Sequence, residues 1–243
     1  MNRVDVDRHP LTLEPNDAGI RGAPSLVVLG TVYTLLVIAS VAALTLFRRD
    51  TTLRDAAALN PFGSPELSRQ FFAADLVATR VSAFLGFASA IPLAIYSATL
   101  VARLQFLGVR HAGVYIAFAG GIAASGGLAA AGLFLWLLSV PDIVSAISVA
   151  RGLHFLVFLC GGPGFAVGMG LLAGGASISS RLNGLLPRWV VWLGLLIAAT
   201  GALSSLGMLS LPITVAIPIT RVGGFAWLIA AGALMPLEQR QTV

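Results

Sequence analysis

The feature that most constrains this chain is a series of apolar runs, each about as long as a membrane-crossing helix. A hydrocarbon layer about 30 Å thick requires roughly 20 residues of α-helix. Backbone amides in lipid must find hydrogen bonds within their own segment, so each run is expected to be helical. The sequence therefore predicts an all-α, polytopic transmembrane bundle of six spans, at residues 25–47, 81–102, 112–139, 152–177, 189–211 and 222–237.

The composition indicates the same class. Hydrophobic residues make up 57% of the chain and charged residues 10%, and no water-soluble fold could bury so much apolar surface. The polar stretches are too short for a separate soluble domain. We expect a polar cytoplasmic tail over residues 1–24, one embedded domain over 25–237 and a short tail over 238–243.

The loop between the first two spans contains a helix-start signature. Ser64 is a favourable cap, Pro65 suits the first helical position, and Glu66 places an acidic group in the first turn. Helix two is therefore predicted to begin outside the membrane and to run inward through Phe71 and Phe72.

The chain contains no lysine, because all 15 basic residues are arginines. This excludes a retinal or pyridoxal Schiff base and a phosphate-loop lysine. The arginines lie at the edges of apolar runs, a pattern typical of contact with anionic lipids, and nucleic acid is not an expected partner. The lone Cys160 excludes an intrachain disulfide and a multi-cysteine metal site. No metal or cofactor is expected.

Arginine placement also predicts orientation. Two of the short loops on one side carry Arg103, Arg110, Arg181 and Arg188. The excess favours a cytoplasmic location for these loops and for both termini. Arginines of the first loop, on the opposite side, weigh against this orientation: Arg48, Arg49, Arg54 and Arg69.

An internal repeat is the most informative pattern. A segment of Arg80, Phe84, Leu85, Phe87 and Pro92 returns 71 residues later as Arg151, Phe155, Leu156, Phe158 and Pro163. A weaker third copy holds Arg221 and Phe225. The pattern predicts that helix pairs two–three and four–five are parallel repeats about an axis along the membrane normal, although low-complexity apolar sequence can imitate duplication.

The repeat nominates a candidate site. It places Arg80, Arg151 and Arg221 at the outer starts of the even-numbered helices and at a similar depth, with His154 one turn below Arg151 and Asp75 in the same layer. On one interpretation the arginines mark the water boundary. On the other, some of them converge on an outward-open cavity and bind a carboxylate or an anionic head group.

Two prolines and many glycines predict the internal packing. Pro92 and Pro163 are expected to kink or unwind helices two and four near mid-membrane. The small-x-x-x-small spacing in helix four favours close contacts within one bundle over a dedicated dimer face. The oligomeric state remains open. The glycines concerned are Gly164, Gly168, Gly170 and Gly174, with Gly120, Gly121, Gly126 and Gly127 in helix three.

Several short motifs carry a resemblance: Asn60-Pro-Phe-Gly-Ser-Pro-Glu66, Arg80-Val-Ser-Ala-Phe84, Gly161-Gly-Pro-Gly164, Leu186-Pro-Arg-Trp189 and Arg221-Val-Gly-Gly-Phe225-Ala-Trp227. In this order, from about Ser25 to Pro236, the chain resembles a family of uncharacterised bacterial multi-pass membrane proteins described as a domain of unknown function. The resemblance implies a six-helix bundle in the bacterial cytoplasmic membrane, and no activity, ligand or catalytic residues.

Three function classes follow from these observations. The repeat, the kinked helices and the arginines favour a non-catalytic binding, sensing or transport-like bundle for a lipid or small amphiphile. A membrane enzyme is the alternative, but few ionisable groups besides His154 lie within the spans, so no catalytic residues are nominated. A structural subunit of a larger membrane complex is a third class. Membrane lipids and a lipid-like or small anionic ligand are the expected partners.

Overall fold

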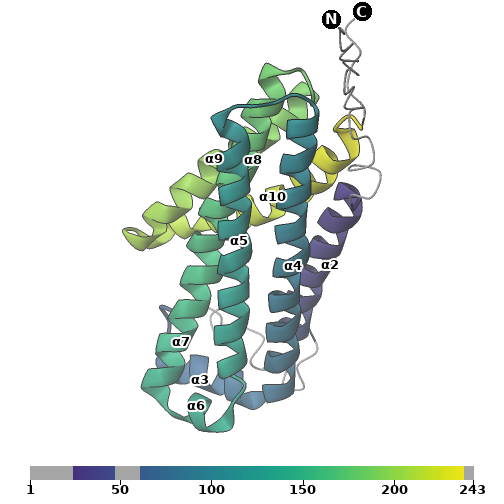
Figure 1. The fold of residues 1–243 in the computed structure, drawn as a ribbon. Coiled ribbons are helices and arrows are strands. Elements are labelled where there is room, and N and C mark those ends of the chain that lie inside the picture. The colour runs from purple at the N-terminus through teal and green to yellow at the C-terminus, as the bar shows by residue number, and fades with distance from the viewer. Residues whose placement is uncertain (1–23, 47–60, 238–243) are drawn as a thin grey trace, which may run out of the picture.

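The computed structural model describes residues 24–46 and 61–237, and these residues form an all-helical bundle (Figure 1). The predicted fold class is confirmed, because six helices are long and apolar enough to cross a membrane. The predicted tails fall outside the described residues, apart from Pro24. The six are α2 (Leu26–Thr45), α4 (Leu76–Phe106), α5 (Ala112–Leu137), the continuous helix made of α7 (Ile147–Leu159) and α8 (Phe165–Leu182), α9 (Arg188–Ser205) and α10 (Ala216–Leu234).

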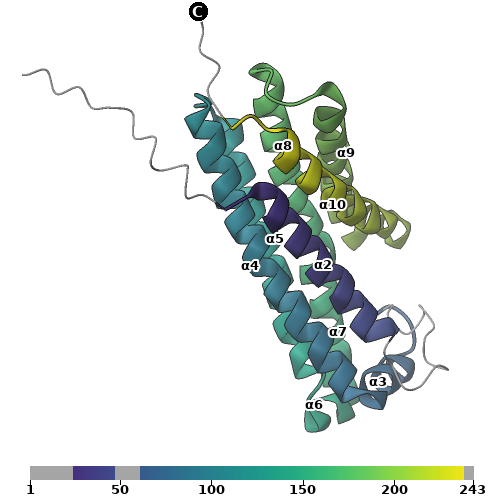
Figure 2. The same cartoon turned by 90° about the vertical axis from the view of Figure 1, so that its right-hand side faces the viewer.

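The three longest helices, α4, α5 and α7–α8, run side by side (Figure 1). Helix α2 packs on α4, α9 packs on α8, and α10 lies between α2 and α9 (Figure 2). We call the end that contains α3 (Pro65–Ala74) and α6 (Pro141–Ser145) the α6 end. The opposite end, with the α4–α5 and α8–α9 turns, is the loop end, and the start of α2 and the end of α10 both lie there.

The helix-start signature correctly marks α3, which begins at Pro65 with Ser64 as its cap. The prediction that this helix continues into the membrane is wrong, because the chain breaks at Asp75. The Asp75 carboxylate accepts a 2.9 Å hydrogen bond from the backbone N–H of Ala78 and so caps a new helix, α4. Helix α3 instead lies across the α6 end and buries Phe71 and Phe72.

Glycines hold α5 and α8 at close range. A Cβ atom on Gly120 would lie 2.5 Å from Leu171 Cβ, and one on Gly168 would lie 2.5 Å from the backbone nitrogen of Ala124. Only glycine permits backbones to approach this closely. Gly170 and Gly174 face α9 instead. The predicted role of these glycines in contacts between helices is confirmed, except at two positions. A Cβ on Gly126 would meet nothing within 4 Å, and one on Gly164 would meet only Leu159 of the same continuous helix.

The two prolines have different surroundings. Pro92 lies inside α4, which stays α-helical from Leu76 to Phe106. Pro163 lies in a π-helical turn, Cys160–Gly164, that joins α7 to α8. Proline has no backbone N–H to donate, and three glycines in this turn accept the altered geometry. The duplication that links the two prolines stays a prediction.

The α9–α10 hairpin is shorter than the rest of the bundle. After α9 the chain forms 3₁₀ turns at Leu206–Met208 and Leu211–Val215 and then returns as α10. Both views show the hairpin tip part-way along the bundle, well short of the α6 end (Figures 1 and 2). Helix six was predicted to begin at residue 222, but α10 begins at Ala216, so Arg221 lies within the helix.

Candidate ligand cavity

Arg80 occupies a boundary position at the α6 end. Its Nε and one terminal guanidinium nitrogen donate 3.3 Å hydrogen bonds to the hydroxyl and carbonyl oxygens of Ser139, just beyond the last turn of α5. Carbonyls at a helix C-terminus are exposed acceptors with partial negative charge, and arginine satisfies them well. This geometry agrees with the boundary-marker interpretation for Arg80.

Three other candidates at the α6 end have local partners. Asp75 caps α4. The guanidinium carbon of Arg151 lies 5.8 Å from the centroid of the Phe155 ring. His154 is buried, and its ring packs edge-on against Phe72 with the centroids 5.0 Å apart. The contact between His154 and Phe72 packs α7 against α3 at this end.

Arg221 has a different environment. One of its terminal nitrogens donates to the carbonyl oxygen of Gly161, in the π-helical turn. Its guanidinium carbon lies 4.8 Å from the centroid of the Phe165 ring, a cation–π geometry. Gly161 is ten residues beyond Arg151 along the chain, or roughly 15 Å of helix. The expectation that Arg80, Arg151 and Arg221 lie at one depth is therefore wrong, because α10 starts near the middle of the bundle.

Arg221 lines a cavity of about 400 Å³ bounded by α2, α4, α5, α7 with its π-helical turn, and the first turns of α10. Most of the lining is aliphatic or aromatic. Five lining side chains are polar: Ser40, Thr45, Ser82, Ser89 and Arg221. The second, fourth and sixth predicted spans correspond to α4, α7–α8 and α10, and all three contribute residues to the lining.

Two serines on α2 and α4 form another polar part of the lining. The Ser40 hydroxyl of α2 donates to the backbone carbonyl of Ser82 at 2.8 Å, and the two hydroxyl oxygens are 3.1 Å apart. Neither serine was predicted as a site residue from the sequence. The available signal was a small polar residue inside each of two apolar runs.

Tyr33 lies close to the same region. It is one turn of α2 from Val37, which lines the cavity, and its ring packs on Phe225 with the centroids 5.7 Å apart. Its hydroxyl is buried, has no hydrogen-bond partner among the described residues, and lies within electrostatic reach of Arg221. Most buried hydroxyls have a hydrogen-bond partner, so Tyr33 is an unusual polar group in this region.

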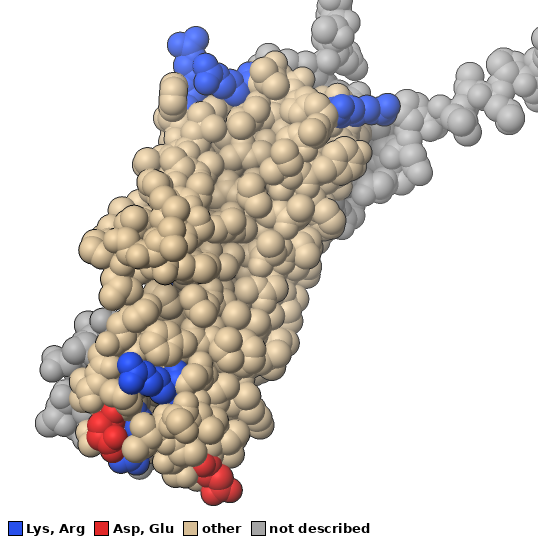
Figure 3. Space-filling model, turned by 90° about the vertical axis from the view of Figure 1, so that its left-hand side faces the viewer, with Lys and Arg blue, Asp and Glu red and all other residues tan. Residues whose placement is uncertain are grey.

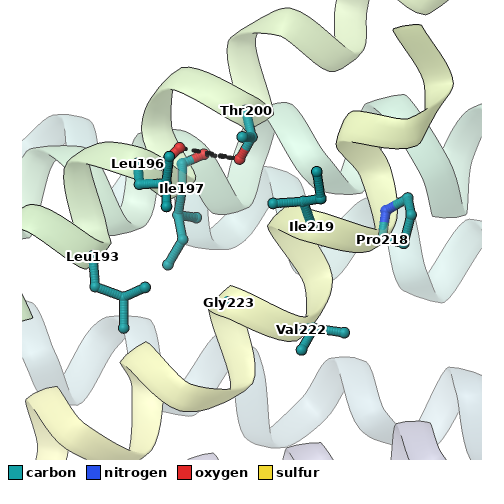
Figure 4. Close-up of a pocket in the computed structure, with 8 residues that line it drawn as sticks. All are labelled: Leu193, Leu196, Ile197, Thr200, Pro218, Ile219, Val222 and Gly223. Atoms are coloured by element: carbon teal, nitrogen blue, oxygen red, sulfur yellow. Dashed lines mark hydrogen bonds between the residues drawn. The ribbon is translucent and has the colours of Figure 1, made fainter. Parts of the chain in front are cut away.

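Two further cavities have no cationic side chain in their lining. One, of about 440 Å³, is a groove between α9 and α10 whose only polar lining side chain is Thr200 (Figure 4). The other, of about 670 Å³, lies between α2, α3 and the start of α4 and includes Asp75. Of the three cavities, that of Arg221 has the cationic lining group.

Apart from Arg221, the described charges lie near the two ends of the bundle. Figure 3 shows blue arginines near both ends and red carboxylates at the α6 end, with an uncharged band between them. The described carboxylates are Glu66, which pairs with Arg69 at 3.2 Å, Asp75 and Asp142. None lines the Arg221 cavity, and Arg221 forms no salt bridge with any described residue.

The lining does not form a catalytic arrangement. No carboxylate, histidine or cysteine lines the Arg221 cavity. The described parts of the chain contain no group of three or more metal-ligating side chains. The arrangement offers a guanidinium, three serine hydroxyls and apolar walls, which can bind an amphiphile but supply no acid–base pair.

No protein-family model, curated protein or solved structure matches the chain. The resemblance to a bacterial family of unknown function therefore stays a prediction.

Proposed function

We propose that this protein is a non-catalytic membrane bundle that binds a lipid or small amphiphile with an anionic head group in the Arg221 cavity. The observation that carries the proposal is a guanidinium in the wall of an otherwise uncharged cavity, with no described carboxylate to balance its charge.

A cation within the hydrocarbon region is expensive, and such residues usually pair with an anion or face a polar cavity. Arginine carries five N–H donors, and one terminal nitrogen of Arg221 donates to the carbonyl oxygen of Gly161. A carboxylate or phosphate could take up a further edge of the guanidinium in paired hydrogen bonds.

The rest of the wall fits an apolar chain. Residues such as Val41, Leu135 and Phe158 line the cavity beside the arginine. A head group at Arg221 with an acyl chain along these side chains would satisfy both parts of the lining, as ligand sites combine apolar walls with a few placed polar groups.

We further propose that the loop end faces the cytoplasm of a bacterial cell, because Arg103, Arg110, Arg181 and Arg188 belong to that end. Both termini would then be cytoplasmic. The cavity would face the outer half of the bilayer.

The test compares two probes of equal chain length, dodecanoate and dodecanol, added to protein in phosphatidylcholine nanodiscs. At about ten times its Kd, dodecanoate should stabilise the wild type by about 1.4 kcal/mol and raise Tm by roughly 3–5 °C. Dodecanol should shift Tm less, because it brings no negative charge. The tryptophan fluorescence melting curve measures both shifts.

Variants assign the effect to the cavity. Arg221→Gln should abolish the difference between the two probes, and Arg188→Gln, at an exposed position of the loop end, should retain it. Equal shifts from both probes in the wild type would contradict the proposal. So would an undiminished dodecanoate effect in folded Arg221→Gln.

A structural subunit of a larger complex remains the alternative class. Stoichiometric copurification of a second membrane protein, together with no probe response in the isolated chain, would favour that class over ligand binding.

A further inference from the structure

The tip of the α9–α10 hairpin is apolar and exposed. Residues 206–215 read Leu-Gly-Met-Leu-Ser-Leu-Pro-Ile-Thr-Val and contain no charged side chain. Met208 is 65% exposed, Leu209 86% and Val215 62%. A turn with this composition is a poor water-facing loop, because it presents large apolar side chains and no charged residue beside them.

The contacts of the hairpin place it away from the charged layer at the α6 end. Near the tip, Ile217 of α10 comes within 3.3 Å of a Cβ built on Gly162. From Gly162 the helix runs back 15 residues to Ile147, roughly 22 Å. Both views show the tip part-way along the bundle (Figures 1 and 2).

The charged layers bracket this depth. Arg80 and Arg103 on α4 are 23 residues apart, or roughly 35 Å, which is the thickness of a hydrocarbon core with its margins. The hairpin tip lies at a height between the two ends of α4 (Figures 1 and 2). Its backbone is largely satisfied by 3₁₀ turns and by hydrogen bonds such as Ser210 N–H to the Leu206 carbonyl at 3.0 Å, as a segment in lipid requires.

We propose that α9 and α10 form a re-entrant hairpin whose tip ends inside the hydrocarbon and contacts lipid acyl chains, so that this pair enters and leaves the membrane at the loop end. Each helix is long enough to cross, but their tilt and the early turn at Leu206 keep the tip from the far surface. The inference is independent of any ligand in the Arg221 cavity.

The experiment measures access to single cysteines in a Cys160→Ala background. Ser210→Cys and Leu209→Cys report on the tip, Ser64→Cys on the α6 end and Asn183→Cys on the loop end. A membrane-impermeant maleimide is applied to intact and to opened membranes. Labelling after denaturation in SDS measures the total reactive thiol.

We expect Ser64→Cys and Asn183→Cys to label from opposite sides, whereas Ser210→Cys and Leu209→Cys label from neither side until SDS is added. A nitroxide attached at residue 210 should collide with oxygen in preference to a water-soluble nickel complex. Labelling of Ser210→Cys from the same side as Ser64→Cys, at a comparable rate, would overturn the proposal. Preferential nitroxide collision with the nickel complex would overturn it as well.

Discussion

At the scale of single residues, side-chain hydrogen bonds to backbone carbonyls join helices that are distant in sequence. The Tyr96 hydroxyl of α4 donates to the carbonyl oxygen of Leu228 in α10 at 2.8 Å, and both residues are fully buried. Arg221 donates to the carbonyl of Gly161 in the same manner. Such bonds link α10 to the bundle core although the hairpin is short.

The Tyr96 bond gives a residue-scale prediction. Tyr96→Phe should lower the free energy of unfolding by about 1 kcal/mol, because it removes the donor and leaves the acceptor buried. Tyr115→Phe is the matched control, since Tyr115 is 62% exposed. Melting curves of the two variants in the same nanodiscs provide the measurement. Equal Tm values for both would mean that the hydroxyl contributes nothing.

At the scale of helices, the α5–α8 contact depends on the absence of Cβ atoms. Gly168 lies against the backbone of Ala124, which cannot move aside as a flexible side chain could. Backbone contact at this range lets dispersion forces act over the whole seam, which is the main source of helix association in lipid.

The close α5–α8 contact predicts that alanine substitutions at two glycines have different effects on stability. Gly168→Ala should destabilise the protein by about 1–3 kcal/mol, because the added methyl group forces the helices apart. Gly126→Ala, on the partner helix, should stay within about 0.5 kcal/mol, since nothing lies within 4 Å of its Cβ. The loss of Tm in each variant measures the effect. A tolerated Gly168→Ala would show that the seam can relax.

At the scale of the whole molecule, the sequence predicts which segments are apolar helices better than it predicts how deep each helix lies in the bundle. Apolar run length predicted the class and the six helices, because length in hydrocarbon is a strong and local constraint. It could not predict the break at Asp75, which depends on a capping bond at Ala78. Nor could it predict the tilt and depth of α9–α10, which depend on long-range packing.

Of the residues that line the candidate site, only Arg221 was predicted from the sequence, and its depth was predicted wrongly. Arg221 was nominated from sequence, but the repeat placed it in a layer with Arg80 and Arg151. A one-dimensional repeat contains no information on the depth at which α10 begins. The Ser40–Ser82 pair joins residues 42 positions apart and could be recognised only from the packing of α2 against α4.

A charge placed at the hairpin tip tests its surroundings. Leu209→Asp should lower stability or membrane insertion by about 2.5–3.5 kcal/mol if the tip lies in hydrocarbon. Leu182→Asp, next to Arg181 at the loop end and 71% exposed, should change stability by less than about 0.5 kcal/mol. The folded fraction of each variant in native membranes provides the measurement. A tolerated Leu209→Asp would place the tip in water.

The short α9–α10 hairpin also gives the two ends of the bundle unequal cross-sections. With the hairpin tip inside the hydrocarbon, as proposed above, the leaflet at the loop end would accommodate six helices, whereas the opposite leaflet would hold four, α2, α4, α5 and α7. A protein of this form is a wedge. Lipids around the narrow half must fill the area beneath the hairpin, so the protein would favour membranes that curve toward that leaflet.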